Sequence, residues 1–373
     1  MFDLPSSTKI DVAKLSSVFK NVTMTYKYYF FLAILHEVKK NVMRDSLSLD
    51  KARLGAAMLG LAWHARTVYA LNFGIGDKLQ ALIDELKLCL NLGDRESTDK
   101  IIDEIYAHKD DAKVSQIISL LLNYVPVKFL SGYVGSAPDT KAGNLKIALA
   151  SQDQDSHSIY KLYLNEKGKF DHLVIDNEHL SYLRLHISIL TDFTYFHLGM
   201  FFEKRNLSVP NILDKIIWQK PRDSLAPQRG LFKIYLEHHS PQFCLYDPQR
   251  LLNPQDFALD HFIPWSFVSH NQIWNLIPVD QITNSIKSNA VPDLSHYLKA
   301  LVHMHYGFLQ DLKYARLKPQ SKSQEQAVRS FEFLGQSLKN LQSVSESELA
   351  EIYFKVMDPL AKQASFAGFA VFA

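Results

Sequence analysis

Hydrophobic residues recur at helical spacing through most of the N-terminal third of the chain. Between residues 25 and 40, Tyr28, Phe31, Leu32 and Leu35 fall on one face of a helix. Comparable apolar stripes, separated by Asn, Asp, Gly and Ser, lie at residues 12–19, 49–70, 79–90, 101–106 and 114–122. This pattern predicts a helical N-terminal domain over residues 1–130.

The following segment, residues 131–224, mixes several patterns. Its first part, residues 131–157, is rich in Gly, Ser, Asp and Gln, which predicts a connector with a short strand at residues 145–149. Two apolar runs, residues 159–164 and 172–175, then flank Asn165-Glu166-Lys167-Gly168 and predict a β-hairpin. A long amphipathic helix is expected near residues 177–204, and a shorter one near residues 209–218.

Residues 240–310 replace long apolar stripes with short strand-like runs, turn residues and scattered His, Asn and Asp. Helical spacing returns after Ser323, which predicts a helical tail over residues 311–373. The expected fold class is therefore α+β, with helices predominating and a small mixed module at residues 225–310.

Composition narrows the class of protein only slightly. The 373 residues are 47% hydrophobic, and 41 Lys and Arg against 39 Asp and Glu leave a net charge of +2, so charge alone does not indicate a nucleic-acid binder. Cys89 and Cys244 lie far apart and suit a reducing compartment. The N-terminus lacks a signal-peptide pattern, and the apolar stretch at residues 28–35 is too short to span a bilayer. We expect a cytoplasmic protein with no membrane partner.

Candidate chemistry is concentrated in three elements that follow one another between residues 258 and 292. The first is Asp260-His261-Phe262-Ile263-Pro264, the second contains Asn275, and the third runs Asn284-Ser285-Ile286-Lys287. A histidine titrates near neutral pH and can accept a proton from water. A carboxylate and an amide oxygen suit a hard divalent cation. A strand over residues 257–262 would direct Asp260 and His261 to opposite faces, and a following helix would align Asn284 with Lys287.

These elements resemble the HNH, or ββα-metal, nuclease motif, and in particular the HNH domain of the large RNA-guided CRISPR effectors. The resemblance implies that His261 is the general base and that Asp260 and Asn284 are metal ligands. It further implies that Asn275 pins the loop that orients the histidine, and that Lys287 lies near the scissile phosphate. The implied cofactor is Mg²⁺ or Mn²⁺, and the implied module covers residues 225–310.

Two departures from the family pattern change details of this interpretation. Many HNH enzymes have a histidine as the last metal ligand, where this chain has Asn284. Many relatives also carry a zinc-binding Cys-x-x-Cys, where this chain has Cys244-Leu245-Tyr246-Asp247. No structural zinc is therefore expected.

Other polar residues in this region have ordinary explanations. His270 is more often a solvated loop histidine than a phosphate contact, and Lys287 alone could merely decorate a helix. The histidines of the next predicted helix have irregular spacing and are expected on its surface or in its core packing: His296, His303 and His305.

The sequence thus predicts a metal-dependent endonuclease acting on DNA, of the kind found among bacterial restriction or anti-phage effectors. The dense apolar content of residues 24–36 and 54–71 suggests that the helical region forms a homo-oligomer or docks a regulatory partner such as an ATPase. Two alternatives remain open: a non-catalytic nucleic-acid-binding or structural subunit, and a homing or genome-maintenance nuclease.

Overall fold

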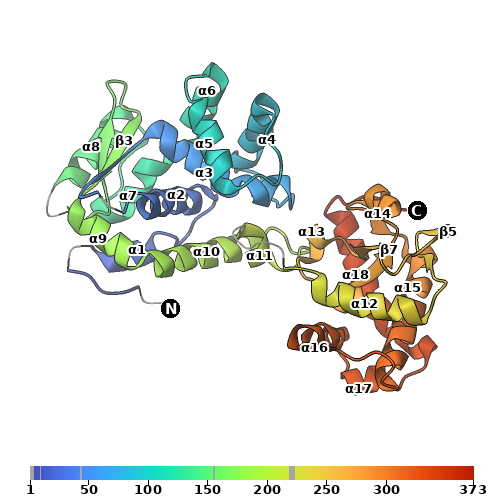
Figure 1. Ribbon diagram of the computed structural model, residues 1–373. Helices are drawn as coiled ribbons and strands as arrows, with labels where there is room; N and C mark the ends of the chain where they lie inside the picture. The colour runs from blue at the N-terminus through green and yellow to red at the C-terminus, as the bar shows by residue number, and fades with distance from the viewer. Residues whose placement is uncertain (1–3, 9, 43, 154–155, 218–222) are drawn as a thin grey trace. The chain divides into compact units, whose positions relative to one another are not determined.

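The computed structural model describes residues 4–8, 10–42, 44–153, 156–217 and 223–373, and the chain divides into two compact units (Figure 1). Unit 1 comprises Met1–Leu207 with Ile212–Trp218, and unit 2 comprises Ser208–Asn211 with Gln219–Ala373. The predicted segment 1–130 lies in unit 1, whereas the predicted module at 225–310 and the tail at 311–373 share unit 2.

Unit 1 is built around two helices that are buried on all sides, α2 (Tyr26–Lys40) and α3 (Lys51–Thr67). On α3, Gly60 lets α5 (Thr98–Ala107) approach closely, because a Cβ there would overlap the side chain of Ile102. The remaining helices of unit 1 are α1 (Val12–Ser17), α4 (Leu79–Leu90), α5 (Thr98–Ala107), α6 (Ala112–Leu121), α7 (Val125–Val134), α8 (Lys141–Gln152), α9 (Asn177–Leu185), α10 (Ile187–Glu203) and α11 (Ile212–Ile216).

The burial of α2 and α3 corrects one part of the sequence interpretation. The apolar content of residues 24–36 and 54–71 exceeds what one helical layer needs, which suggested a docking surface. Consecutive residues of both helices are instead buried within unit 1, from Tyr28 to Leu35 and from Leu54 to Ala65. These side chains form the core of the unit, so their density is explained without a partner.

A three-stranded antiparallel sheet of order β1-β3-β2 lies in the same unit. The predicted hairpin is present as β2 (Lys161–Leu164) and β3 (Phe170–Ile175). Its third strand, β1 (Leu47–Asp50), falls where only helical spacing was expected, and it pairs along β3 from Leu47 opposite Ile175 to Asp50 opposite His172.

The strand predicted at residues 145–149 is wrong, because these residues belong to α8. Thr140 caps that helix by accepting a hydrogen bond from the Gly143 amide, and Ile147 and Ala148 are buried on one side of it. The apolar Leu145 and Leu149 are about half exposed on the helix surface. The long helix expected over 177–204 is divided into α9 and α10 at His186.

Residues 112–134 are long and apolar enough, by length and composition alone, to cross a membrane. More than half of this stretch, which forms α6 and α7, is buried in the folded chain. Core helices of a folded domain pass the same test, so the stretch is weak evidence for a span.

Unit 2 begins with α12 (Ala226–His238) and encloses one hydrophobic core that runs from Leu231 to Ala364. Its other helices are α13 (Trp265–Val268), η2 (Ile273–Asn275), α14 (Gln281–Lys287), α15 (Leu294–Lys313), α16 (Lys322–Arg329), η3 (Ser330–Leu334), α17 (Leu338–Leu341) and α18 (Glu346–Phe366). Its strands are β4 (Phe243–Cys244), β5 (Asp247–Leu251), β6 (Ala258–His261), β7 (Leu276–Val279), β8 (Val291–Pro292) and β9 (Val371–Phe372).

The C-terminal helices pack directly on the mixed module of unit 2. Helix α18 packs along α15, and the imidazole of His305 joins the two layers. Nε2 of His305 lies 2.9 Å from the carbonyl oxygen of Leu276 on β7, and Nδ1 lies 2.7 Å from the hydroxyl of Tyr353 on α18. Strand β9 adds to β8 in parallel, with Val291 opposite Val371. The tail is therefore part of the scaffold that holds the candidate site.

Candidate active site

Two antiparallel strands and the helix after them carry most of the predicted site. Strand β6 pairs with β7, with Asp260 opposite Ile277 and His261 opposite Leu276. Helix α14 follows β7 directly, because Asp280 caps it by accepting hydrogen bonds from two backbone amides of its first turn. The order of these elements is thus strand, strand, helix.

Asp260 and His261 point to opposite sides of β6, as successive strand residues must. The Asp260 side chain is turned into unit 2 and is buried, whereas the His261 side chain is partly exposed. The two groups therefore occupy different environments despite being neighbours in sequence.

The Asp260 carboxylate is held by two buried donors. The hydroxyl of Tyr246 donates to Oδ2 at 2.8 Å. Nζ of Lys287 lies 2.9 Å from Oδ2 and 3.1 Å from Oδ1, and it also donates to the His261 carbonyl at 2.9 Å. Lys287 thus connects the end of α14 to both residues of the Asp-His pair.

This position of Lys287 differs from the one that the family resemblance implied. The side chain was expected near a phosphate, but its exposed fraction is 0% and its ammonium points into unit 2. Burial lowers the pKa of Lys287, against the opposing effect of Asp260, and burial raises the pKa of Asp260, against the opposing effect of Lys287. Two buried charges are tolerated because each neutralises the other, so the lysine's direct role is to balance Asp260.

Asn275 fixes the segment that leaves β6. Its Oδ1 accepts a hydrogen bond from the amide of Ile263 at 2.8 Å, and its Nδ2 donates to the carbonyl of the same residue at 2.8 Å. Its own carbonyl accepts from the amide of Phe262 at 2.8 Å. Because Asn275 is fully buried, these bonds hold the backbone just after His261 in one conformation.

The imidazole of His261 has a partner that sequence reasoning missed. Nε2 of His261 lies 2.9 Å from Oδ1 of Asn271, in the loop between β6 and β7. Nδ2 of Asn271 donates to the carbonyl of Asp223 at 2.8 Å, and this bond fixes which way the amide faces. Oδ1 must then face the histidine, and since it can only accept, Nε2 must carry the proton.

Sequence signals for the two missed residues were present but ambiguous. The loop had drawn attention only to His270, one residue before Asn271, because histidine is the commoner functional residue. In the sequence, Tyr246 stands out only as part of an incomplete zinc motif. A polar residue in a loop that returns beside a strand-end histidine is a candidate orienting partner, but residues 269–272 are all polar and the sequence does not single out Asn271.

Asn284 lies one helical turn before Lys287 on α14 and is partly exposed. Among the described residues, its side chain makes no hydrogen bond, and no group of three or more His, Cys, Asp and Glu side chains is arranged to hold a metal ion. The candidate donors are the Asp260 carboxylate, whose oxygens are held by Tyr246 and Lys287, and the Asn284 amide oxygen, a pair that would leave most positions on an ion to water and phosphate. Such a set fits Mg²⁺, which retains several waters, better than zinc.

The other histidines of the module have structural partners. His305 is in the core, and burial lowers its pKa to about 4. His303 is exposed and lies 3.0 Å from Glu346, and His296 lies 3.4 Å from Asp293. Arg250, on β5, bridges Asp247 and the cap residue Asp280, so it stabilises the start of α14.

Comparison with known proteins identifies one part of the chain. Residues 245–293 match the protein-family model described as HNH endonuclease, a range that includes Tyr246, Asn271 and all five predicted site residues. No curated protein and no solved structure matches the chain.

Proposed function

Unit 2 contains an HNH endonuclease domain, and we propose that the protein is a metal-dependent endonuclease that cleaves DNA with His261 as the general base. The observation that carries the proposal is the arrangement around this imidazole. A general base needs a lone pair at a defined position, and the hydrogen bond from Nε2–H to Asn271 leaves the lone pair on Nδ1. Asn275 holds the backbone on the other side of the same residue.

In this proposal Asn271 and Asn275 are positioning residues and His261 accepts the proton of the attacking water. Asn271 sets the tautomer and the ring orientation of His261, in the way that a second hydrogen-bonding partner orients a catalytic histidine. Asn275 fixes the turn of the chain after β6.

Asp260 and Asn284 would hold the divalent cation, Mg²⁺ or Mn²⁺. When bound, the ion would supply positive charge for the phosphate and the departing oxygen. Lys287 contributes by keeping the Asp260 carboxylate ionised inside the unit, and the Tyr246 hydroxyl orients that carboxylate.

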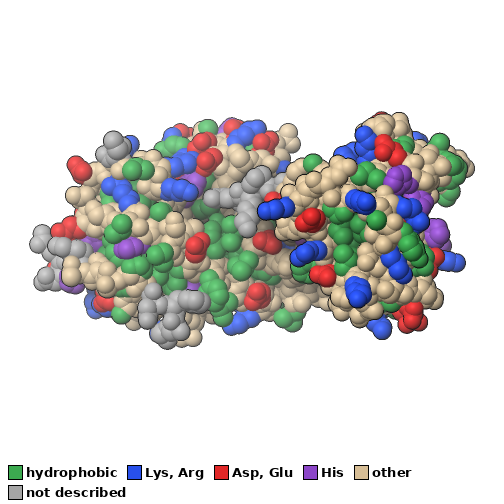
Figure 2. All heavy atoms as spheres, turned by 60° about the horizontal axis from the view of Figure 1, so that its bottom comes forward, with side chains coloured by type: hydrophobic (Ala, Val, Ile, Leu, Met, Phe, Trp, Pro, Cys, Tyr) green, Lys and Arg blue, Asp and Glu red, His purple; other side chains and the backbone are tan. Residues whose placement is uncertain are grey.

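The surface of unit 2 supports a nucleic-acid substrate. The chain as a whole is nearly neutral, but the face of unit 2 drawn in Figure 2 shows more Lys and Arg than Asp and Glu side chains, around a hydrophobic area. Such local positive charge is what phosphate contacts require.

The direct test is incubation of the purified protein with supercoiled plasmid, with and without Mg²⁺. We expect Mg²⁺-dependent nicking or linearisation by the wild type, and a loss of about 10²–10⁴-fold in His261→Ala. His296→Ala, on the surface of α15, is the matched histidine control and should cleave like the wild type. Cleavage by His261→Ala within a few-fold of wild type would refute the assignment.

A cytoplasmic restriction or anti-phage role belongs to the same proposal, with unit 1 as the regulatory or self-associating part. Self-association or docking through unit 1 is supported by apolar side chains that α9 and α10 leave exposed, which include Leu185, Ile189 and Met200. Light scattering should show an oligomer that Met200→Glu weakens, whereas Leu88→Glu, at an exposed apolar position on α4, should not. A monomeric wild type would remove self-association from the proposal.

A further inference from the structure

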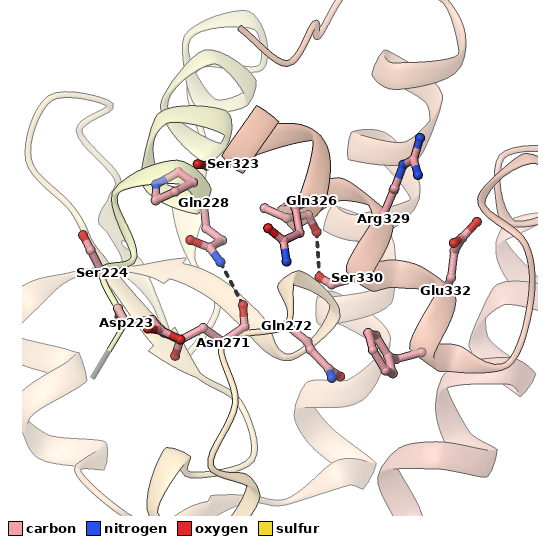
Figure 3. A pocket seen from close by; sticks show the side chains of 13 residues that line it. Asp223, Ser224, Gln228, Asn271, Gln272, Ser323, Gln326, Arg329, Ser330 and Glu332 are labelled. Atoms are coloured by element: carbon pink, nitrogen blue, oxygen red, sulfur yellow. Dashed lines mark hydrogen bonds between the residues drawn. The ribbon is translucent and has the colours of Figure 1, made fainter. Parts of the chain in front are cut away.

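A cavity with both polar and apolar lining lies in unit 2, beside the loop that holds His261. Its volume is about 740 Å³, within the range of small-molecule sites (Figure 3). Three parts of the unit line it: the start of α12 with the residues before it, the loop at residues 271–272, and the segment formed by α16 and η3.

The cavity is connected to the general base through a single residue. Asn271 lines the cavity, and its side chain accepts the hydrogen bond from His261. Its backbone carbonyl accepts a hydrogen bond from Nε2 of Gln228 at 2.9 Å, drawn as a dashed line in Figure 3. An occupant of the cavity would therefore lie one side chain away from the proposed catalytic imidazole.

Hydrogen bonds between elements give the cavity a defined wall. The amide of Ile273 donates to Oγ of Ser330 at 2.9 Å, which joins the loop to η3. Nε1 of Trp274 donates to Oε1 of Gln272 at 2.6 Å, which fixes the orientation of that amide. The polar groups of this wall are therefore preorganised rather than free to rotate.

Besides three serines, Arg329 and the carboxylates of Asp223 and Glu332, the lining has four carboxamide side chains: Gln228, Asn271, Gln272 and Gln326. A carboxamide presents a donor and an acceptor side by side, which is the pattern that Asn and Gln use to bind the edge of a nucleobase. Gln228 is buried, and its Oε1 has no hydrogen-bond donor among the described residues. That oxygen is enclosed by protein, so the carboxamides able to meet a base edge are those of Gln272, which is half-buried, and Gln326, which is exposed.

An aromatic ring stands at the same cavity. Phe333, on η3, lines it with 68% of its surface exposed, although neighbouring Phe331 and Leu334 are buried. An exposed ring beside amide groups is a suitable platform for stacking a base. Arg329 also lines the cavity and makes no ion pair within the described part of the chain, so it can contact a phosphate.

We propose that this cavity binds one unpaired nucleobase with its sugar-phosphate, stacked on Phe333 and hydrogen-bonded by the carboxamides. The proposal rests on the proposed nuclease function in one respect: the bound base is taken to belong to the substrate strand, next to the cut. A free nucleotide has the same chemistry and is the second source to be distinguished. A stacked, unpaired base beside Asn271 would give the enzyme a preference for DNA that is single-stranded or locally unpaired at the cut site.

Binding can be measured without catalysis, by fluorescence anisotropy with the full-length protein in EDTA. The probes are a labelled perfect duplex, the same duplex with one unpaired base, and the matching single strand. We expect the probe with one unpaired base to bind more tightly than the perfect duplex. Phe333→Ala should weaken binding of that probe about tenfold, as for the loss of one stacked base. Phe354→Ala, an equally simple loss of an exposed ring on α18, is the control and should bind like the wild type.

Mononucleotides added as competitors identify the source of the base. Displacement of the labelled strand by dAMP, dCMP, dGMP or dTMP, lost in Phe333→Ala, indicates that the cavity takes a base of the substrate. Calorimetric binding of a mononucleotide that needs Phe333 but does not displace the strand indicates a free nucleotide. Equal affinity of the wild type for the duplexes with and without an unpaired base, with no mononucleotide binding, would overturn the proposal. So would equal binding by Phe333→Ala and Phe354→Ala.

The plasmid assay separates this result from the proposed function. If base binding depends on Phe333 but the protein never cleaves plasmid, the proposed nuclease function is refuted and base binding in the cavity is retained. Plasmid cleavage without Phe333-dependent base binding would retain the nuclease function and refute base binding in the cavity.

Discussion

Nζ of Lys287 lies 2.9 Å from Oδ2 of Asp260, and neither side chain is appreciably exposed to solvent. The pair joins the last residue of α14 to the strand that carries His261. A charge pair in this position does not simply add stability, because removing both charges from water costs free energy that their attraction must offset. Its presence is better explained by the need for an ionised carboxylate at this point in the unit.

Single substitutions in this pair should be more harmful than the double substitution. Asp260→Asn or Lys287→Met leaves one buried charge without its partner and should lower the free energy of unfolding by about 3–5 kcal/mol. The double variant buries no charge and should lose less than the sum of the two. Urea denaturation of all four proteins tests this, and additive losses would show that the two groups do not interact.

Metal binding should depend unequally on the two proposed ligands. Asp260→Ala removes a charged ligand and should weaken Mn²⁺ binding more than Asn284→Ala, which removes a neutral one. Calorimetric titration with Mn²⁺ measures both affinities directly. Ser285, next to Asn284 on the exposed side of α14, provides the control variant Ser285→Ala. Unchanged affinities in the Asp260 and Asn284 variants would mean that the ion binds elsewhere.

Asn271 should affect turnover more than substrate affinity if it orients His261. Asn271→Ala removes the acceptor for Nε2–H and should lower kcat by about 10–100-fold, the usual loss for a partner that orients a functional histidine. Asn271→Asp retains an acceptor oxygen at the same place and should recover most of that loss. Steady-state kinetics on an oligonucleotide separates kcat from KM. Equal defects in both variants would indicate a merely structural asparagine.

The buried His305 should make unit 2 sensitive to acid. Its pKa is about 4 in the folded protein and near 6.5 when unfolded, so the unfolded chain takes up a proton first as the pH falls. Stability should therefore fall between pH 6.5 and about pH 4, by about 1.4 kcal/mol per pH unit from this group. His305→Gln, which cannot titrate, should show a shallower dependence in urea denaturation across this range. The same slope in both proteins would contradict the assignment.

The sequence predicted the structure best where residue type and residue spacing within one short segment indicate the same element. The hairpin at residues 161–175 was predictable because a turn sequence separates two apolar runs, and helix α2 because its apolar face repeats at helical spacing. The HNH domain was predictable because Asp260-His261, Asn275 and Asn284 follow one another in the order of the family motif.

What could not be predicted depends on contacts between distant segments. Strand β1 has helical neighbours, and only its pairing with β3 makes it a strand. The position of Lys287 depends on which side of α14 faces β6, and sequence spacing alone was compatible with a phosphate contact or a solvated surface. The role of Asn271 depends on the path of a loop, which has no periodic pattern from which it could be derived.

The pairing of β9 with β8 determines when, during synthesis, this unit can complete its fold. Val291 and Pro292 close the matched HNH segment, yet the strand that pairs with them is made about 80 residues later, at Val371 and Phe372. A ribosome-bound chain that already contains Asp260 and His261 therefore lacks one edge of the unit around them. Because α18 and β9 both follow the matched segment in the chain, this domain can be completed only after residue 372 has been made. A chain with the proposed nuclease activity would then stay inactive during this interval without needing an inhibitor.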